Sequence, residues 1–66
     1  MAVAKVIEIS AESERNFEDA INKGIATASK TVRNIMGAWV KEQQVTVENG
    51  KIVSYRVNLK VTFLLD

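Results

Sequence analysis

Strict alternation of apolar and polar residues near the C-terminal end is the sequence feature that most constrains the fold. From residue 53 onward every second residue is apolar or aromatic, and polar residues fill the positions between them as far as Thr62. Successive side chains of a β-strand point to opposite faces of a sheet. The pattern therefore predicts a long strand with one buried face and one polar face. The apolar positions are Val53, Tyr55, Val57, Leu59, Val61, Phe63 and Leu65.

The dipeptide Asn49-Gly50 joins this strand to an earlier run, residues 38–48, which we expect to be its hairpin partner. Asn-Gly is the preferred pair for a type I′ turn, because both central residues of that turn need a positive φ. Pairing outward from a two-residue turn fixes the register of the hairpin. It sets Glu48 opposite Lys51, Gln43 opposite Arg56 and Trp39 opposite Lys60.

Two further elements are expected before the hairpin. Residues 3–10 are rich in β-branched residues and predict a strand. Ser13 is the expected N-cap of a helix over residues 14–31, where apolar residues recur at spacings of three and four. The predicted fold class is α+β, with the order β-α-β-β in one domain, 1–66. Its three-stranded antiparallel sheet has the last strand in the centre and the helix on one face.

The difference in length between the last strand and the helix predicts self-association. The final strand would be roughly 45–50 Å long at about 3.3 Å per residue, whereas the helix would reach only about 27 Å at 1.5 Å per residue. One helix cannot cover that hairpin, so apolar ends such as Val53, Tyr55, Phe63 and Leu65 would be exposed in a monomer. The 66 residues include no Cys and no His, which excludes disulfides and imidazole or thiolate zinc sites as support. We therefore expect an obligate homo-oligomer.

Composition argues against several classes of function. The formal charge is +1, and the nine Lys and Arg residues are spread along the chain rather than clustered, which disfavours nucleic-acid binding. Lys5 and Glu8 interrupt any apolar core of a signal peptide, and no apolar run approaches membrane-spanning length. A cytoplasmic location is the expectation. Without His or Cys, and without a Ser that has an identifiable base, the chain is not expected to be an enzyme.

Three segments and the order of the elements resemble the dodecin family. The segments are KVIEI at 5–9, ATASKTVRNI at 26–35 and YRVNLKVTF at 55–63, and the resemblance covers nearly the whole chain. It implies a hollow homododecamer that binds and stores flavins (riboflavin, FMN or FAD) without catalysing a reaction. It also implies a site in which a Trp stacks on the flavin ring and a Gln bonds the polar edge of that ring.

Both of those family positions are altered in this chain. The Trp position falls on Gly37, and the Gln position falls on Arg56, which has donors but no acceptor. The run VKEQ at 40–43, with Lys51-Ile52 and Tyr55-Arg56, resembles a subgroup that lacks the two flavin residues and includes calcium-holding members. The resemblance thus implies either a flavin-binding shell with a changed site, or a structural or calcium-holding shell.

The expected ligand-binding residues are Trp39, Gly37, Arg56 and Gln43. Trp39 shares a predicted face with Gly37 and Arg56, so it is either a displaced platform for a flat ligand or an anchor in a core or interface. Arg56 is either a clamp for phosphate or carboxylate, or an inter-subunit or cross-strand polar contact of Gln43 or of a neighbouring carboxylate.

Oxygen ligands for a calcium ion would come from carboxylates that symmetry gathers on an axis, because no single segment supplies six to eight oxygens. The alternative is that these groups form solvated surface charge. They are Glu42, Glu48, Asp66 and the helix-start cluster Glu12, Glu14, Glu18 and Asp19.

Overall fold

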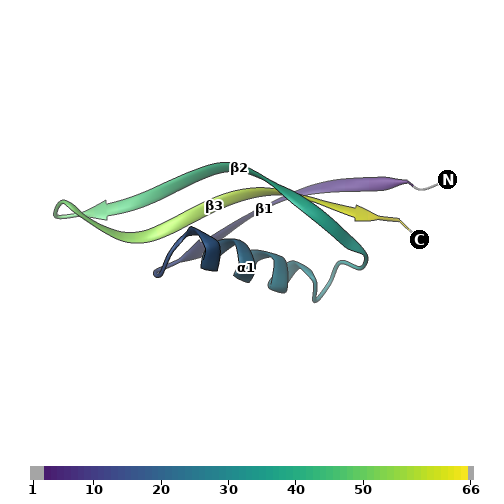
Figure 1. Cartoon of the computed structure of the whole chain (residues 1–66), viewed down its shortest axis with the longest axis horizontal. Coiled ribbons are helices and arrows are strands. Elements are labelled where there is room, and N and C mark those ends of the chain that lie inside the picture. The colour runs from purple at the N-terminus through teal and green to yellow at the C-terminus, as the bar shows by residue number, and fades with distance from the viewer. Residues whose placement is uncertain (1–2, 66) are drawn as a thin grey trace.

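The computed structural model describes residues 3–65, which form three strands and one helix in the order β-α-β-β (Figure 1). The strands are β1 (Ala4–Ser13), β2 (Ile35–Glu48) and β3 (Lys51–Leu64), and the helix is α1 (Phe17–Ala28). β3 is the central strand and pairs antiparallel with both neighbours, so the predicted topology is confirmed. The predicted carboxylate ligand Asp66 lies outside the described residues.

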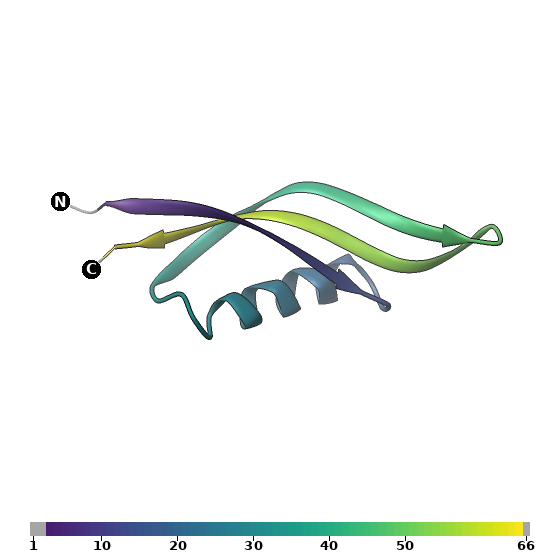
Figure 2. The same cartoon turned by 180° about the vertical axis from the view of Figure 1, so that it is seen from behind.

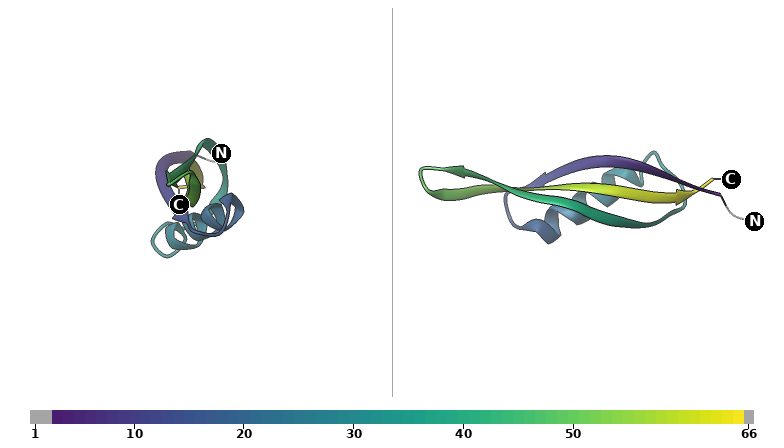
Figure 3. Two further views of the ribbon diagram at one scale, coloured as in Figure 1. Left: turned by 90° about the vertical axis from the view of Figure 1, so that its left-hand side faces the viewer. Right: turned by 90° about the horizontal axis from the view of Figure 1, so that it is seen from above.

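The hairpin turn has the expected backbone conformation. Asn49 has φ 53° and Gly50 has φ 73°, which are the positive values that a type I′ turn needs at both central residues. Away from the turn, β2 and β3 continue as a two-stranded arm that extends beyond α1 and the end of β1 (Figures 1 and 3). The arm makes the molecule elongated, with principal extents of 52 × 19 × 13 Å.

The core lies between α1 and one face of the β1–β3 pair, and the opposite face of the sheet is bare (Figure 2). Val57, Leu59 and Val61 from β3 and Ala20 from α1 are fully buried. These are the alternating positions of β3 that the sequence predicted to face inward. Partly buried apolar residues complete the core, namely Ile7, Ile9, Ala11, Phe17, Ile21, Ile25 and Ile35.

Helix α1 begins three residues later than predicted because β1 extends further along the chain. Ser13 is not the N-cap but the last residue of β1, opposite Tyr55, and it is buried. Asn16 caps the helix instead, and its Oδ1 accepts a hydrogen bond of 2.7 Å from the backbone N–H of Asp19.

The other element bounds also differ from the predictions. α1 ends at Ala28, and the three residues after it form a turn in which the Ser29 hydroxyl donates to the Ile25 carbonyl at 2.8 Å. β2 begins at Ile35 rather than at Ala38, because a bulge at Met36 allows pairing with β3 to continue past Gly37.

The predicted register of the hairpin is right at its two ends and wrong between them. Glu48 lies opposite Lys51 and Trp39 opposite Lys60, as expected. An extra residue in β2 between Val40 and Glu42 shifts the pairing by one, and an extra residue in β3 between Ser54 and Ile52 restores it. Within the shifted segment each β2 side chain faces the side opposite to the one predicted.

Candidate functional site

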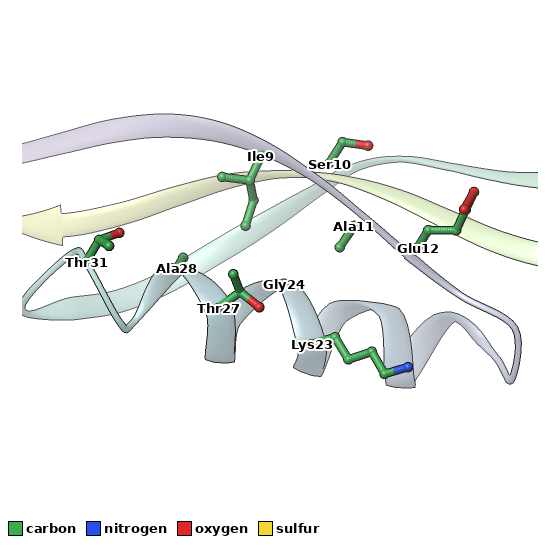
Figure 4. Close-up of a pocket in the computed structure, with 9 residues that line it drawn as sticks. All are labelled: Ile9, Ser10, Ala11, Glu12, Lys23, Gly24, Thr27, Ala28 and Thr31. Atoms are coloured by element: carbon green, nitrogen blue, oxygen red, sulfur yellow. The ribbon is translucent and has the colours of Figure 1, made fainter.

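The face of the sheet turned away from α1, here called the open face, carries most of the polar side chains of the strands. Cross-strand partners in a sheet share a face, so the register defines rows of side chains across β1, β3 and β2. In β1 the side chains of Ile9 and Ala11 point toward the helix, whereas Ser10 points away from it (Figure 4). Three rows of the open face matter here: Glu8–Lys60–Trp39, Ser10–Asn58–Glu42 and Glu12–Arg56–Gln44.

Each of the three carboxylates in these rows has a partner. Glu8 Oε1 lies 3.3 Å from Lys41 Nζ, and Glu12 Oε1 lies 3.0 Å from Arg56 Nη2. Glu42 Oε1 accepts a hydrogen bond of 3.0 Å from Asn58 Nδ2. Two of these carboxylates are therefore balanced by a positive charge, and the third is bonded to a neutral amide.

Trp39 presents its indole to solvent beside an empty space. Its side chain is 63% exposed, so it does not anchor the core of the chain itself. Gly37 lies two residues earlier on the same face, and a Cβ built at Gly37 would meet nothing within 4 Å. Because Gly37 has no side chain to cover the neighbouring indole, a second flat ring can stack on the exposed face of Trp39.

Arg56 shares the open face with Trp39, as predicted, but the expected pairing of Arg56 with Gln43 is wrong. The bulge after Val40 sets Gln44 opposite Arg56 and sets Gln43 opposite Val57, a residue of the core face. The assignment of Trp39, Gly37, Arg56 and Gln43 to ligand binding stays a prediction.

A polar hollow of about 320 Å³ lies along this shifted segment of the hairpin. Its walls are formed entirely by side chains that carry amides or charges, with one carboxylate and one guanidinium among them. Two rows of the open face contribute four of these residues. The lining residues are Glu42, Gln43, Gln44, Arg56 and Asn58.

A larger groove of about 440 Å³ runs between β1 and α1, beside the free edge of β1 (Figure 4). Small residues such as Ala11, Gly24 and Ala28 line its floor. Its charged residues are already paired, Glu12 with Arg56 and Lys23 with Asp19 at 3.2 Å. The groove thus offers surface for packing, and none of its charged groups is free.

Asp19, near the start of α1, is held by two neighbouring side chains. Ser13 Oγ donates to Asp19 Oδ2 at 2.5 Å, and this bond, with the hydrogen bond from Lys23, holds the pKa of Asp19 below its usual value. Within residues 3–65 no three acidic side chains lie close enough together to hold a metal ion. No helix in the same range is long and apolar enough to cross a membrane.

Sequence reasoning named Glu42 as a possible oxygen ligand, but it missed Gln44 and Asn58 as residues of this site. Residues 41–44 form an unbroken polar run, Lys-Glu-Gln-Gln, in which alternation cannot tell which residues face outward. That interruption in an otherwise apolar strand is the signal for a bulge, but it does not show where the extra residue lies.

Comparison with known proteins gives consistent matches over nearly the full chain. The family model described as Dodecin matches residues 3–66. The calcium dodecin of Mycobacterium tuberculosis is 35% identical over 63 residues, which cover 96% of this chain and 89% of that protein. A dodecin of Thermus thermophilus is 36% identical over 64 residues, which cover 97% of this chain and 93% of that protein.

Solved structures match equally well. The dodecin from Streptomyces davaonensis superposes with a TM-score of 0.94 at 32% identity, covering 98% of this chain and 96% of that chain. The calcium-chelating calcium dodecin from Mycobacterium tuberculosis gives a TM-score of 0.83 at 37% identity, covering 97% of this chain and 91% of that chain. The strand order, the helix position and the long hairpin are therefore shared with solved dodecins.

Proposed function

The chain belongs to the dodecin family, and we propose that it is a non-enzymatic, self-assembling binding protein that holds a flat ring of the flavin class against Trp39. The observation that supports ligand binding is the exposed indole of Trp39 beside the open space at Gly37. A flat aromatic ligand can bury one of its faces there without displacing any side chain.

Exposed apolar surface supports the proposal that the chain self-assembles. α1 packs mainly against β1 and β3, which leaves β2 and the arm without a covering layer. Val47, Ile52 and Val53 in the arm and Val40 in β2 are all more than one third exposed, whereas Tyr55 is covered by Phe17 in an edge-to-face contact of 5.2 Å between ring centroids. Dodecins assemble as dodecamers, and a shell of this kind would bury such surface between subunits.

Light scattering on the purified protein tests the assembly. We expect a particle about twelve times the 7.3 kDa mass of the chain, because the apolar arm cannot be covered within one subunit. Dilution should not release monomers at micromolar concentration, since large apolar interfaces between subunits are stable. A stable monomer would contradict the proposal.

A fluorescence titration of riboflavin tests the ligand. We expect quenching at micromolar protein, because the ring stacks on the indole of Trp39. Trp39→Ala should weaken binding by about 5- to 150-fold, since stacking on an aromatic side chain is worth about 1–3 kcal/mol. Trp39→Phe, which keeps a flat ring, is the matched control and should retain most of the affinity. Absence of quenching in the unchanged protein would overturn flavin binding, and unchanged affinity in Trp39→Ala would remove Trp39 from the site.

Calcium holding is the second candidate, and the similarity to the calcium dodecin of Mycobacterium tuberculosis favours it. Glu42 would be the first ligand to consider, because it lies in the polar hollow with three amide side chains. Calcium needs six to eight oxygens, so copies from neighbouring subunits would have to complete the shell. A melting temperature that is the same in EDTA and in added calcium would exclude this candidate, since binding to the folded state must stabilise it.

A further inference from the structure

The turn at the tip of the arm contains the one Asn-Gly pair of the sequence, Asn49-Gly50. Asparagine is a chemically labile residue, because the backbone nitrogen of the next residue can attack its side-chain carbonyl carbon. Glycine places no side chain beside that nitrogen, so this pair is the most reactive of its kind in the chain. The other asparagines all precede residues with side chains and are Asn16, Asn22, Asn34 and Asn58.

The attacking nitrogen of this pair is open to solvent. Asn49 and Gly50 are both exposed, and the turn lies at the end of the arm, beyond α1 (Figure 1). A Cβ built at Gly50 would meet nothing within 4 Å. The backbone N–H of Gly50 makes no backbone hydrogen bond to another of residues 3–65. Neither a covering side chain nor a hydrogen bond therefore holds the nitrogen in place.

The conformation of the type I′ turn holds the reaction back. The first central residue of such a turn has a ψ of about +30°, and Asn49 has the matching positive φ of 53°. At this ψ the Gly50 nitrogen lies nearly opposite the Asn49 Cβ about the Cα–C bond, so it cannot reach the carbonyl carbon Cγ. The turn must open first, and the rate then follows the fraction of time that the turn is open.

We propose that Asn49 is a site of spontaneous deamidation that is gated by opening of the hairpin turn. In the open turn the Gly50 nitrogen bonds to Asn49 Cγ and loses its proton, and the side-chain amide leaves as ammonia. Water then opens the five-membered ring. Cleavage of the new N–Cγ bond gives aspartate, whereas cleavage of the original peptide bond gives isoaspartate, in which the main chain runs through Cβ and Cγ.

The two products have different effects on the arm. Asp-Gly is also a preferred pair for a type I′ turn, so aspartate keeps Glu48 opposite Lys51. Isoaspartate adds a methylene group to the main chain of a two-residue turn, and the length of the turn sets the register of the hairpin. No layer of the same chain covers the arm, so nothing else in the subunit restores the pairing. Isoaspartate therefore disables the apolar surface that we expect the assembly to bury.

Peptide mapping by mass spectrometry after incubation in warm, mildly alkaline buffer tests the site and its gating. Cleavage after Lys and Arg places Asn34 and Asn49 in separate peptides, 34–41 and 42–51. In urea, peptide 42–51 should gain the mass difference between an amide and a carboxylate. Asn34 is the internal control and should keep its amide, because the β-branched side chain of Ile35 shields the attacking nitrogen.

The native protein should react at least about tenfold more slowly than the protein in urea, the ratio that an opening free energy of about 1.4 kcal/mol gives. An Asn49 that stays unmodified in urea would overturn the site. Equal rates in urea and in the native protein would overturn the gating.

Refolding of the urea-treated protein tests the effect on the arm. Chromatography of peptide 42–51 separates the aspartyl and isoaspartyl forms, and we expect isoaspartate mainly in chains outside the assembly. Asn49→Asp should assemble like the unchanged protein. Asn49→Gly should assemble fully after the same treatment, since Gly-Gly keeps the turn and has no amide to lose.

Equal isoaspartate content inside and outside the assembly would overturn the effect on the arm. Failure of treated Asn49→Gly to assemble would overturn it as well, because the treatment itself would then be the cause. The inference does not depend on ring binding at Trp39. If the unchanged protein is a monomer, the proposed assembly fails, whereas the mapping of Asn49 still confirms or overturns the site.

Discussion

Leu59→Ala is expected to remove a large share of the stability of the folded chain. Leu59 is fully buried and is the largest of the side chains that are completely enclosed. Removing a buried leucine side chain costs about 2–5 kcal/mol, because the cavity does not fully collapse. Small domains have about 5–15 kcal/mol in total, and only four of residues 3–65 are both apolar and fully buried.

Urea unfolding at one fixed protein concentration measures this loss, since self-association makes stability depend on concentration. Leu59→Met is the matched control, because it keeps the volume and should cost less than about 1.5 kcal/mol. An unfolding midpoint for Leu59→Ala that equals that of the unchanged protein would show that the core does not lie at Leu59.

Gly24→Val should separate α1 from β1. A Cβ at Gly24 would lie 3.0 Å from the Cβ of Ala11, with Leu59 Cδ1 at 3.4 Å and Ile9 Cδ1 at 3.5 Å. The Ala11 Cβ is fixed to the backbone and cannot rotate away, so the helix must move. Overpacking of this kind costs about 1–3 kcal/mol and more where the backbone itself must shift.

Ala26→Val is the control for Gly24→Val, because Ala26 is exposed on the same helix. It should cost at most about 0.7 kcal/mol, which is the intrinsic helix penalty alone. Thermal unfolding of both variants separates the two effects. Equal melting temperatures for the two variants would show that the close approach of α1 to β1 is not important for stability.

The fold was predictable because its strongest signals are local. Alternation in β3 and the Asn49-Gly50 turn specify the hairpin, and the apolar spacing specifies the helix. The helix start was less predictable, since Ser13 and Asn16 are both good caps. Pairing of Ser13 with Tyr55 in the sheet decided between them, and that pairing depends on residues far apart in the sequence.

The candidate site was predictable only in part. Trp39, Gly37 and Arg56 do share the open face, because the register is correct at Trp39 and because β3 alternates strictly. The partner of Arg56 was not predictable, since the polar run at residues 41–44 has no alternation to show the bulge. One extra residue there exchanges Gln43 for Gln44 on the open face.

The two bulges that flank residues 42–46 have a consequence for how the site can change. One adds a residue to β2 and the other adds a residue to β3, so their shifts cancel and both ends of the hairpin keep their pairing. The inward and outward order of these five residues is thus set independently of the rest of the strand. If both extra residues joined the regular pairing, the segment would turn over and Gln43 would replace Gln44 on the open face. A binding surface could in this way acquire new side chains through a shift of strand pairing alone, with no substitution, insertion or deletion.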